Sequence, residues 1–223
     1  MPTLLPLAGK VIVIDPGHNG RYQASFNEKL VPSGHGVTKA CNTSGTATKA
    51  GWPEHAYNWS QALALQTTLE TLGATVVLTR QDDDSLGPCV NERAAVANTN
   101  HAALLISIHA DGNDTAGTRG FHVIYSTAMD GGAGLEAASK ALAIDVRDQL
   151  GATKMPRSNY VGQGTALSPR NDMGTLNLLQ NTPGIMLEMG NMHSATDAAL
   201  LKSPDFQASA AWAIATGCAK ALN

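Results

Sequence analysis

The stretch "VIVIDPGHNG", residues 11–20, decides the fold of this chain. Its first four residues are apolar and form the kind of short run that is typical of a fully buried strand. The run ends at Pro16 and Gly17, which are turn residues, and His18 follows them directly. Strands buried on both faces occur mainly in parallel sheets that are covered by helices. The stretch therefore predicts an α/β protein that presents a histidine just beyond the end of a strand.

Apolar runs and helix-like segments alternate along the rest of the chain, which supports this fold class. We expect further strands at 75–79, 103–108, 121–126 and 184–190, and helices at 53–73, 91–100, 134–151 and 206–222. Such alternation predicts one α/β domain over residues 1–223, with a mostly parallel twisted sheet and helices on both faces. Residues 19–51 and 152–183 have no clear periodicity, and we expect them to be long loops that flank the site.

Composition excludes two classes of partner. The 223 residues are 43% apolar, carry a formal net charge of −3 and contain no basic stretch interleaved with aromatic residues, so nucleic acid is not an expected partner. No apolar run approaches the roughly 20 residues that a membrane-spanning helix requires. We expect a monomer without a membrane span.

The three cysteines are not spaced as a zinc knuckle or a redox motif. Cys218 lies in an apolar helical pattern and is expected to be a small buried hydrophobic residue. Cys41 and Cys89 lie in polar, loop-like segments, and they pair if the protein resides in an oxidising compartment. In a reducing compartment they stay free, and the sequence does not choose between the two states.

Four titratable residues stand at predicted element ends or within a buried strand. His18 and His109 follow two strands, Glu54 opens the first long helix, and Glu188 lies inside "GIMLEMG". In an open parallel sheet, ligands bind beyond the carboxyl ends of the strands, where the two histidines lie. Two histidines and one carboxylate are the ligand set of a catalytic zinc ion, and a further carboxylate is needed to move protons. The sequence predicts a zinc hydrolase with His18, Glu54 and His109 as metal ligands and Glu188 as general base.

Each of these residues has an ordinary structural explanation when it is taken alone. A histidine after a strand is usually a satisfied structural residue, and a glutamate in a first helical turn is favoured by the helix dipole. Glu188 could instead pair with a buried arginine, because an acidic group in an apolar strand needs a partner. The coincidence of all four positions favours the metal site.

Five stretches together resemble the zinc-dependent N-acetylmuramoyl-L-alanine amidases of the AmiC type. They are "VIVIDPGHNG", "PEHAYNWSQALALQTTLETLGATVVLTR", "NERAAVAN", "LLISIHADGN" and "GIMLEMGNM", and the similarity extends from about Lys10 to Leu222. The length is similar to that of the compact mycobacterial enzymes. The resemblance implies that His18, Glu54 and His109 bind Zn²⁺ and that Glu188 assists catalysis.

The resemblance also implies a substrate and a location. The expected reaction is hydrolysis of the amide between N-acetylmuramic acid and the L-alanine of a peptidoglycan stem peptide, with peptidoglycan or muropeptide fragments as partners. We expect export to the periplasm or cell wall, directed by a leader peptide that this sequence does not contain. Two features depart from the family pattern: the segment 19–51 is long, and Asn191 and His193 follow "EMG" where an aromatic residue is common.

Other functions use part of the same pattern. A zinc peptidase or deacetylase on a similar scaffold would share the metal chemistry, and a non-catalytic peptidoglycan-binding module would need no general base. A serine hydrolase is disfavoured because the sequence has no GxSxG motif.

The remaining candidates are expected to have lesser roles. His55 adjoins Glu54 but points to another face of the helix. His35 lies in the first long loop, within possible reach of substrate, and His122 is expected to be a packing or surface residue. Arg93 is expected to form a structural ion pair on a helix surface or sheet edge.

Overall fold

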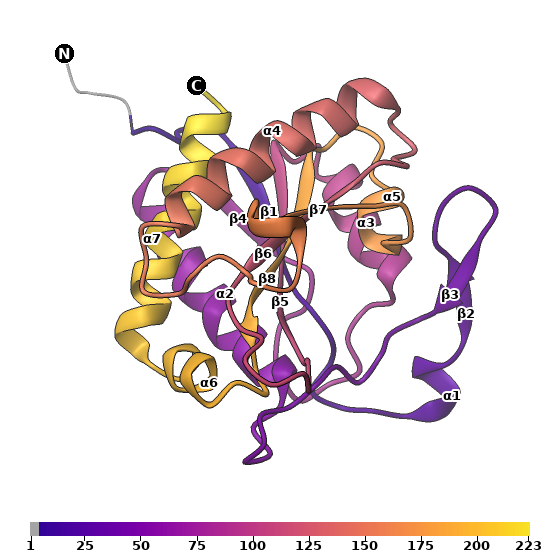
Figure 1. The fold of residues 1–223 in the computed structure, drawn as a ribbon. Coiled ribbons are helices and arrows are strands. Elements are labelled where there is room, and N and C mark those ends of the chain that lie inside the picture. The colour runs from indigo at the N-terminus through magenta and orange to yellow at the C-terminus, as the bar shows by residue number, and fades with distance from the viewer. Residues whose placement is uncertain (1–4) are drawn as a thin grey trace.

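A twisted sheet forms the centre of the molecule (Figure 1). Across residues 5–223, which the computed structural model describes, this sheet has six strands in the order β4-β1-β5-β8-β6-β7. In chain order they are β1 (Val11–Pro16), β4 (Thr75–Leu78), β5 (Leu104–Asp111), β6 (His122–Ser126), β7 (Leu167–Arg170) and β8 (Gly184–Asn191). The predicted α/β fold with a mostly parallel sheet is confirmed, and the five strands expected from apolar runs are all present.

The direction of the strands decides which loops meet. Strands β4, β1, β5 and β8 run parallel, whereas β6 is antiparallel to β8, and β7 runs parallel to β6. The carboxyl ends of β1, β5 and β8 therefore lie at the same end of the sheet. Because β6 runs in the opposite direction, its first residue lies at that end as well.

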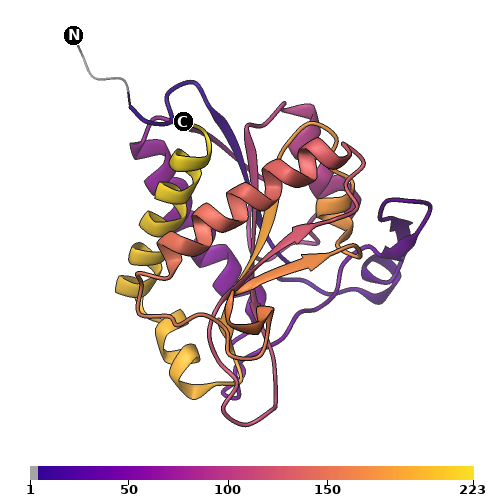
Figure 2. The same ribbon diagram turned by 45° about the horizontal axis from the view of Figure 1, so that its top comes forward.

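Helices cover both faces of the sheet, as Figure 2 shows. One face packs against α2 (Glu54–Thr71), α4 (Ala133–Leu150) and α7 (Pro204–Ala221), with α6 (Ala195–Leu201) beside α7, and the other packs against α3 (Val90–Thr99) and the short α5 (Gly174–Asn177). Alternation along β1 explains both contacts: Ile12 and Ile14 enter the first core, and Val13 enters the second.

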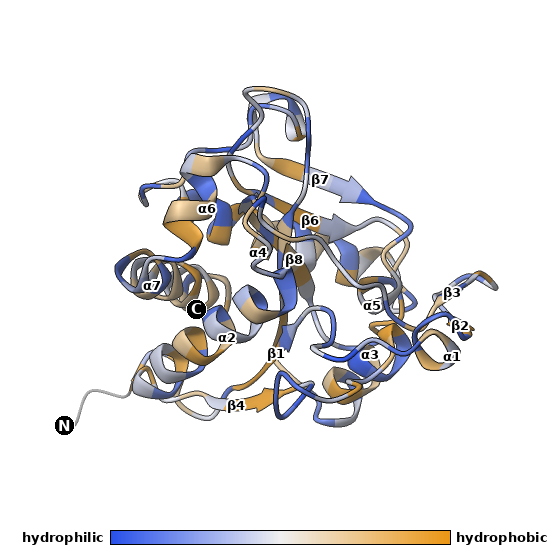
Figure 3. Ribbon diagram, turned by 90° about the horizontal axis from the view of Figure 1, so that it is seen from below, coloured by the Kyte–Doolittle hydropathy of each residue, from blue (hydrophilic) through white to orange (hydrophobic). Residues whose placement is uncertain are grey.

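Hydrophobic and hydrophilic residues are distributed differently between the regular elements and the loops. Figure 3 shows hydrophobic residues on β4 and on turns of the helices, and largely hydrophilic loops around them. Within the described part of the chain, no helix is both long enough and apolar enough to cross a membrane.

The two segments expected to be long loops contain short elements. The first holds α1 (Ala24–Asn27) and a hairpin of β2 (Leu30–Pro32) and β3 (Thr38–Ala40), which projects from the body in Figure 1. The second holds a 3-10 turn (Gly162–Gly164), β7 and α5. Strand β7 was missed because it is a four-residue edge strand, LSPR, without an apolar run. An edge position tolerates its proline, since only one side needs to pair.

A disulfide joins Cys41 to Cys89, which settles the alternative that the sequence left open. It connects the segment after β3 to the residue that caps α3. Cys218 is a buried free thiol in α7, as predicted.

Candidate metal centre

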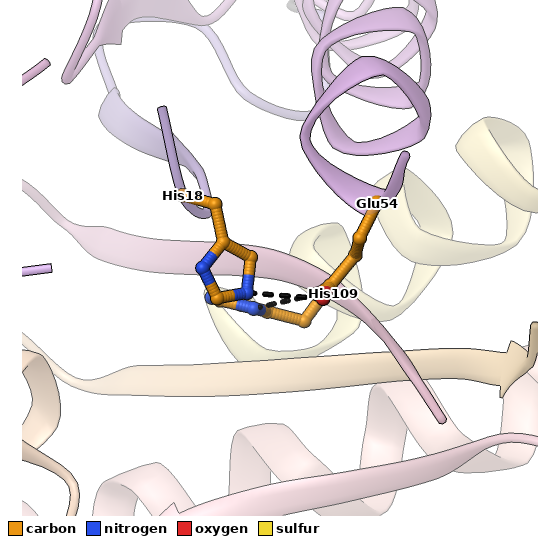
Figure 4. A group of neighbouring side chains, drawn as sticks. All are labelled: His18, Glu54 and His109. Atoms are coloured by element: carbon orange, nitrogen blue, oxygen red, sulfur yellow. Dashed lines mark hydrogen bonds and ion pairs between the residues drawn. The ribbon is translucent and has the colours of Figure 1, made fainter. Parts of the chain in front are cut away.

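Two strand ends and one helix start bring three ionisable side chains together (Figure 4). His18 follows β1, His109 lies near the end of β5, and Glu54 is the first residue of α2. One Glu54 oxygen, Oε2, lies 3.0 Å from His18 Nε2, and the other, Oε1, lies 3.0 Å from His109 Nδ1. One ligand atom from each residue falls within 4.8 Å of the others. The tertiary structure therefore places the three predicted ligands in one cluster.

Surrounding groups hold this cluster in one arrangement. The Nδ1–H of His18 donates to the carbonyl of Thr43 at 2.8 Å, which leaves Nε2 free to act as a ligand. The Glu54 carboxylate accepts the backbone N–H of Thr46 at Oε2 and that of Ala110 at Oε1, at 2.9 and 3.1 Å. These bonds fix the direction of the carboxylate before any ligand binds.

The charge state of Glu54 suits a cation. Burial alone would raise the pKa of this carboxyl group, but His18 and His109 outweigh that effect and hold the pKa well below its ordinary value. The carboxylate thus carries a negative charge at neutral pH, beside two imidazole rings. This donor set, two nitrogens and one carboxylate in a nearly buried cluster, matches the three protein ligands of a catalytic zinc ion.

Two glycines are required by the close approach of the chain to the cluster. A Cβ atom at Gly17 would lie 2.1 Å from His109 Nε2, and one at Gly45 would lie 2.6 Å from Glu54 Oε2. Gly45 also has a φ of +74°, which favours glycine. A side chain at either position would displace a candidate ligand.

A buried ion pair supports the loop that carries His18. Arg93 on α3 pairs with Asp15 at 2.6 Å, and both side chains are almost fully buried. The same guanidinium donates to the carbonyls of Pro16 and His18 and to the side chain of Asn19. The prediction of a structural ion pair is confirmed, but its expected surface or edge position is wrong. The arginine lies beneath the site because five acceptors converge on it there.

A cleft of about 640 Å³ opens over the cluster. Its floor includes the site-facing side chains of β1, β5 and β8, and its wall includes Lys39 of the hairpin and the segment around Thr43. Met173 and Thr175, from the second long segment, close the other side. The two irregular segments therefore flank the site, as expected.

Glu188 lies on β8 in the floor of this cleft. It is the register partner of His109 on the neighbouring strand, so its side chain lies on the same face of the sheet. Burial, and then the charges of Glu54 and Asp111, raise the pKa of Glu188 well above its ordinary value, and Arg170 opposes this only in part. No residue from 5 to 223 makes a hydrogen bond to Oε2 of Glu188. The protonated form of this carboxyl group is therefore more strongly favoured than in an exposed glutamate.

Other histidines have partners outside the cluster. His55 pairs with Asp83 at 3.0 Å on the far side of α2, as its helical position predicted. His35 Nε2 donates to the carbonyl of Ala128 at 2.8 Å and so ties the hairpin to the body. Neither histidine joins the three candidate ligands.

The departure after "EMG" has a structural reason. The side chain of Asn191 donates to the carbonyls of Asn113 and Thr118 and accepts the backbone N–H of Asn113. His193 lies against Thr46, with Nε2 3.1 Å from the hydroxyl oxygen. Asn191 thus braces the loop after β5, and His193 contacts the segment that precedes α2.

Comparison with known proteins agrees with this geometry. The family model described as "N-acetylmuramoyl-L-alanine amidase" matches residues 12–220. The chain belongs to this amidase family. It is accordingly an enzyme that hydrolyses amide bonds.

Mycobacterial amidases are among its most similar relatives. An N-acetylmuramoyl-L-alanine amidase of Mycobacterium tuberculosis is 43% identical over 96% of this chain and 86% of its own length. The crystal structure of the amidase Ami1 of Mycobacterium smegmatis superposes with a TM-score of 0.90, at 43% identity, over 97% of this chain and 98% of that one. Ami1 of Mycobacterium abscessus superposes with a TM-score of 0.91 at 40% identity, over 97% of this chain and all of that one.

Several residues that line the cleft or adjoin Glu188 are not predicted by the sequence. Thr43, Gly45 and Thr46 lie in the irregular first segment, where no periodicity indicates which residues turn inward. His122 was expected to be a packing or surface residue, and it is buried on the same face as Glu188. A strand-register prediction could have found it, because its place depends on which strand pairs with β8.

Proposed function

We propose that this chain hydrolyses the amide bond between the lactyl group of N-acetylmuramic acid and the L-alanine of a peptidoglycan stem peptide, with zinc as its cofactor. One observation carries the proposal. A cluster of two histidines and one ionised glutamate lies in the same cleft as a separate carboxyl group, Glu188, whose pKa is raised. The domain formed by the chain is the catalytic unit.

His18, Glu54 and His109 would hold the zinc ion. Bound zinc supplies an electrophile for the substrate carbonyl and makes water a better nucleophile at neutral pH. The protein contributes the orientation: Thr43 fixes the His18 ring, and Thr46 fixes Glu54. These contacts keep the three side chains in place, so that little reorganisation accompanies the reaction.

Glu188 would act as the general base and then as the general acid. Its carboxylate takes a proton from the attacking water, and its carboxyl group delivers that proton to the departing nitrogen of L-alanine. A raised pKa suits the second step, because it favours the protonated form that delivers the proton to the departing nitrogen. A buried carboxyl group of ordinary pKa would be a poor proton donor.

The shape of the cleft supports a peptidoglycan substrate, and the disulfide supports an exported location. The cleft is open and lined by loops on two sides, so an extended polymer or a soluble muropeptide fragment has access to the cluster. The bond between Cys41 and Cys89 is typical of proteins in oxidising compartments. We propose an exported monomer that acts in the periplasm or cell wall.

Mass spectrometry of muropeptides tests the reaction. We expect the purified chain to release a stem peptide that begins at L-alanine and to leave the glycan intact. A chelator should abolish the release, and added zinc should restore it. Cleavage at another bond would replace the proposal with a zinc peptidase or deacetylase, and zinc binding without cleavage would replace it with a peptidoglycan-binding module.

A further inference from the structure

His122 lies beside Glu188 on the face of the sheet that forms the cleft floor. Strand β8 runs between β5 and β6, and Glu188 is the register partner of His109 on one side and of His122 on the other. Cross-strand neighbours have Cβ atoms roughly 4.5–5.5 Å apart. The three side chains therefore form one row across three strands, and His122 reaches this end of the sheet because β6 begins there.

Both neighbours bury a polar atom that makes no hydrogen bond. Among residues 5–223, neither Nδ1 of His122 nor Oε2 of Glu188 has a partner, and each atom is hidden from solvent. Buried polar atoms almost always bond to another group or to an ordered water molecule. A ring N–H donates and a carboxylate oxygen accepts, so these two atoms complement each other.

The competing acceptor near His122 is already engaged. Asp111 Oδ2 accepts the hydroxyl of Tyr160 at 3.0 Å, and its Oδ1 accepts the N–H of Gly112 at 2.8 Å. The Tyr160 ring meets the His122 ring edge-on, with centroids 6.3 Å apart. Tyr160 thus packs against one side of His122, and Glu188 is the cross-strand neighbour that also has a buried oxygen without a hydrogen bond.

We propose that His122 is a positioning residue for Glu188. Its Nδ1–H donates to a bridging water molecule, which in turn donates to Oε2 of Glu188, and so turns the other carboxylate oxygen toward the cleft. The inference rests on the proposed function, in which Glu188 moves the proton.

The charge state of His122 agrees with this role. Burial lowers the pKa of His122 to about 4, while Asp111 acts to raise it and Arg170 to lower it. At neutral pH the ring is uncharged and has one donor and one acceptor. A neutral donor can orient a carboxylate without the large fall in its pKa that an adjacent cation would cause.

The other charged and titratable groups that face Glu188 come from four elements. They are Glu54 and Tyr57 from α2, His109 and Asp111 from β5, Arg170 from β7 and Tyr160 from the segment after α4. None of them is altered in the variants below, so a change in pH dependence would trace to position 122.

Two substitutions in the zinc-loaded full chain test the proposal by kinetics. His122→Leu should lower kcat about 10- to 100-fold and leave KM within about twofold, because a misplaced base affects the chemical step. Loss of the donor should also move the acidic limb of kcat/KM to higher pH, since a bond to the carboxylate favours its charged form. His122→Asn, which keeps a neutral N–H donor, should recover most of both changes. An exposed histidine provides the matched control, His101→Asn, which should leave kcat and the pH profile unchanged.

Nitrogen-15 NMR of the His122 ring tests the hydrogen bond apart from activity. We expect the Nδ1–H tautomer in the wild-type chain, with a ring shift that changes in Glu188→Gln. The Nε2–H tautomer, or a ring spectrum indifferent to Glu188→Gln, would overturn the proposal, as would a His122→Leu enzyme with wild-type kcat and pH profile. If wild-type protein cleaves no muropeptide, the proposed function fails, and the NMR result still decides whether His122 holds Glu188.

Discussion

The two halves of the cleft floor differ in how completely their polar atoms are bonded. On the side of β1 and β5, Glu54 accepts two backbone N–H groups and faces two histidines, and His18 is tied to a carbonyl. On the side of β8 and β6, Glu188 and His122 each bury an atom that no residue in 5–223 satisfies, and so does the nearby Tyr57 hydroxyl.

Under the proposed function, the difference corresponds to two tasks, metal binding and proton transfer. A group that binds a cation should keep one charge and one orientation, and many hydrogen bonds to its charged form enforce both. A group that shuttles a proton needs two protonation states of similar free energy, so strong bonds to either state would hinder it. We therefore expect substitutions on the two sides to fail in different ways.

The largest expected effect separates metal binding from proton transfer. His109→Ala should lose both zinc and turnover, because it removes a ligand. Glu188→Gln should keep its zinc, and its turnover should fall by about 10²- to 10⁴-fold, which is typical for loss of an acid-base group. Elemental analysis and initial rates measure the two quantities. Loss of zinc in Glu188→Gln would show that the two sides are not separate.

The next largest effect is expected for Arg93, which supports the loop that carries His18. Arg93→Met should lower the free energy of unfolding by about 3–5 kcal/mol, because it leaves the buried Asp15 carboxylate unpaired. It should also weaken zinc binding by roughly tenfold, since the His18 loop loses its anchor. Urea unfolding and zinc titration measure these changes. Arg157→Met removes an exposed ion pair and should cost less than about 1 kcal/mol. Equal losses in both variants would contradict the assigned role of Arg93.

The disulfide should stabilise the segment that orients His18. The bond closes 48 residues, for which the loop-entropy relation gives about 4 kcal/mol. Cys41→Ala combined with Cys89→Ala should lower the melting temperature, and a reductant should do the same to the wild-type chain. The double variant is its own control, because a reductant should not change its melting temperature further. A reductant effect in the double variant would assign the stabilisation to another group.

The smallest expected effect concerns His122 on β6, and it depends on pH. The pKa of His122 is about 4 in the folded chain, below the ordinary histidine value of 6.5, so the unfolded chain binds more protons between these values. Stability should therefore fall as pH drops from 6.5 to 4, by about 3 kcal/mol from this residue. His122→Asn should lack this part of the loss, which urea unfolding at both pH values can measure. Identical pH dependence in both proteins would mean that His122 is not buried in its neutral form.

Much of the fold and the identity of four site candidates could be predicted from the sequence. Apolar runs located β1, β4, β5, β6 and β8, because a buried strand must be apolar on both faces. The turn after β1 and the polar residues at strand ends indicated His18, His109, Glu54 and Glu188. Their roles as ligands and base remain predictions. These features depend on residues that are close together in the chain, which is why sequence alone determined them.

Only the tertiary structure decided what surrounds these residues. The burial of Arg93 beneath His18 and the pairing of Cys41 with Cys89 join segments that are far apart in the chain. The place of His122 beside Glu188 depends on the antiparallel direction of β6, which no local pattern encodes. Periodicity reports the burial of a side chain, whereas strand order and register determine its neighbours. Those neighbours decide which polar atoms at this site are hydrogen-bonded and which are not.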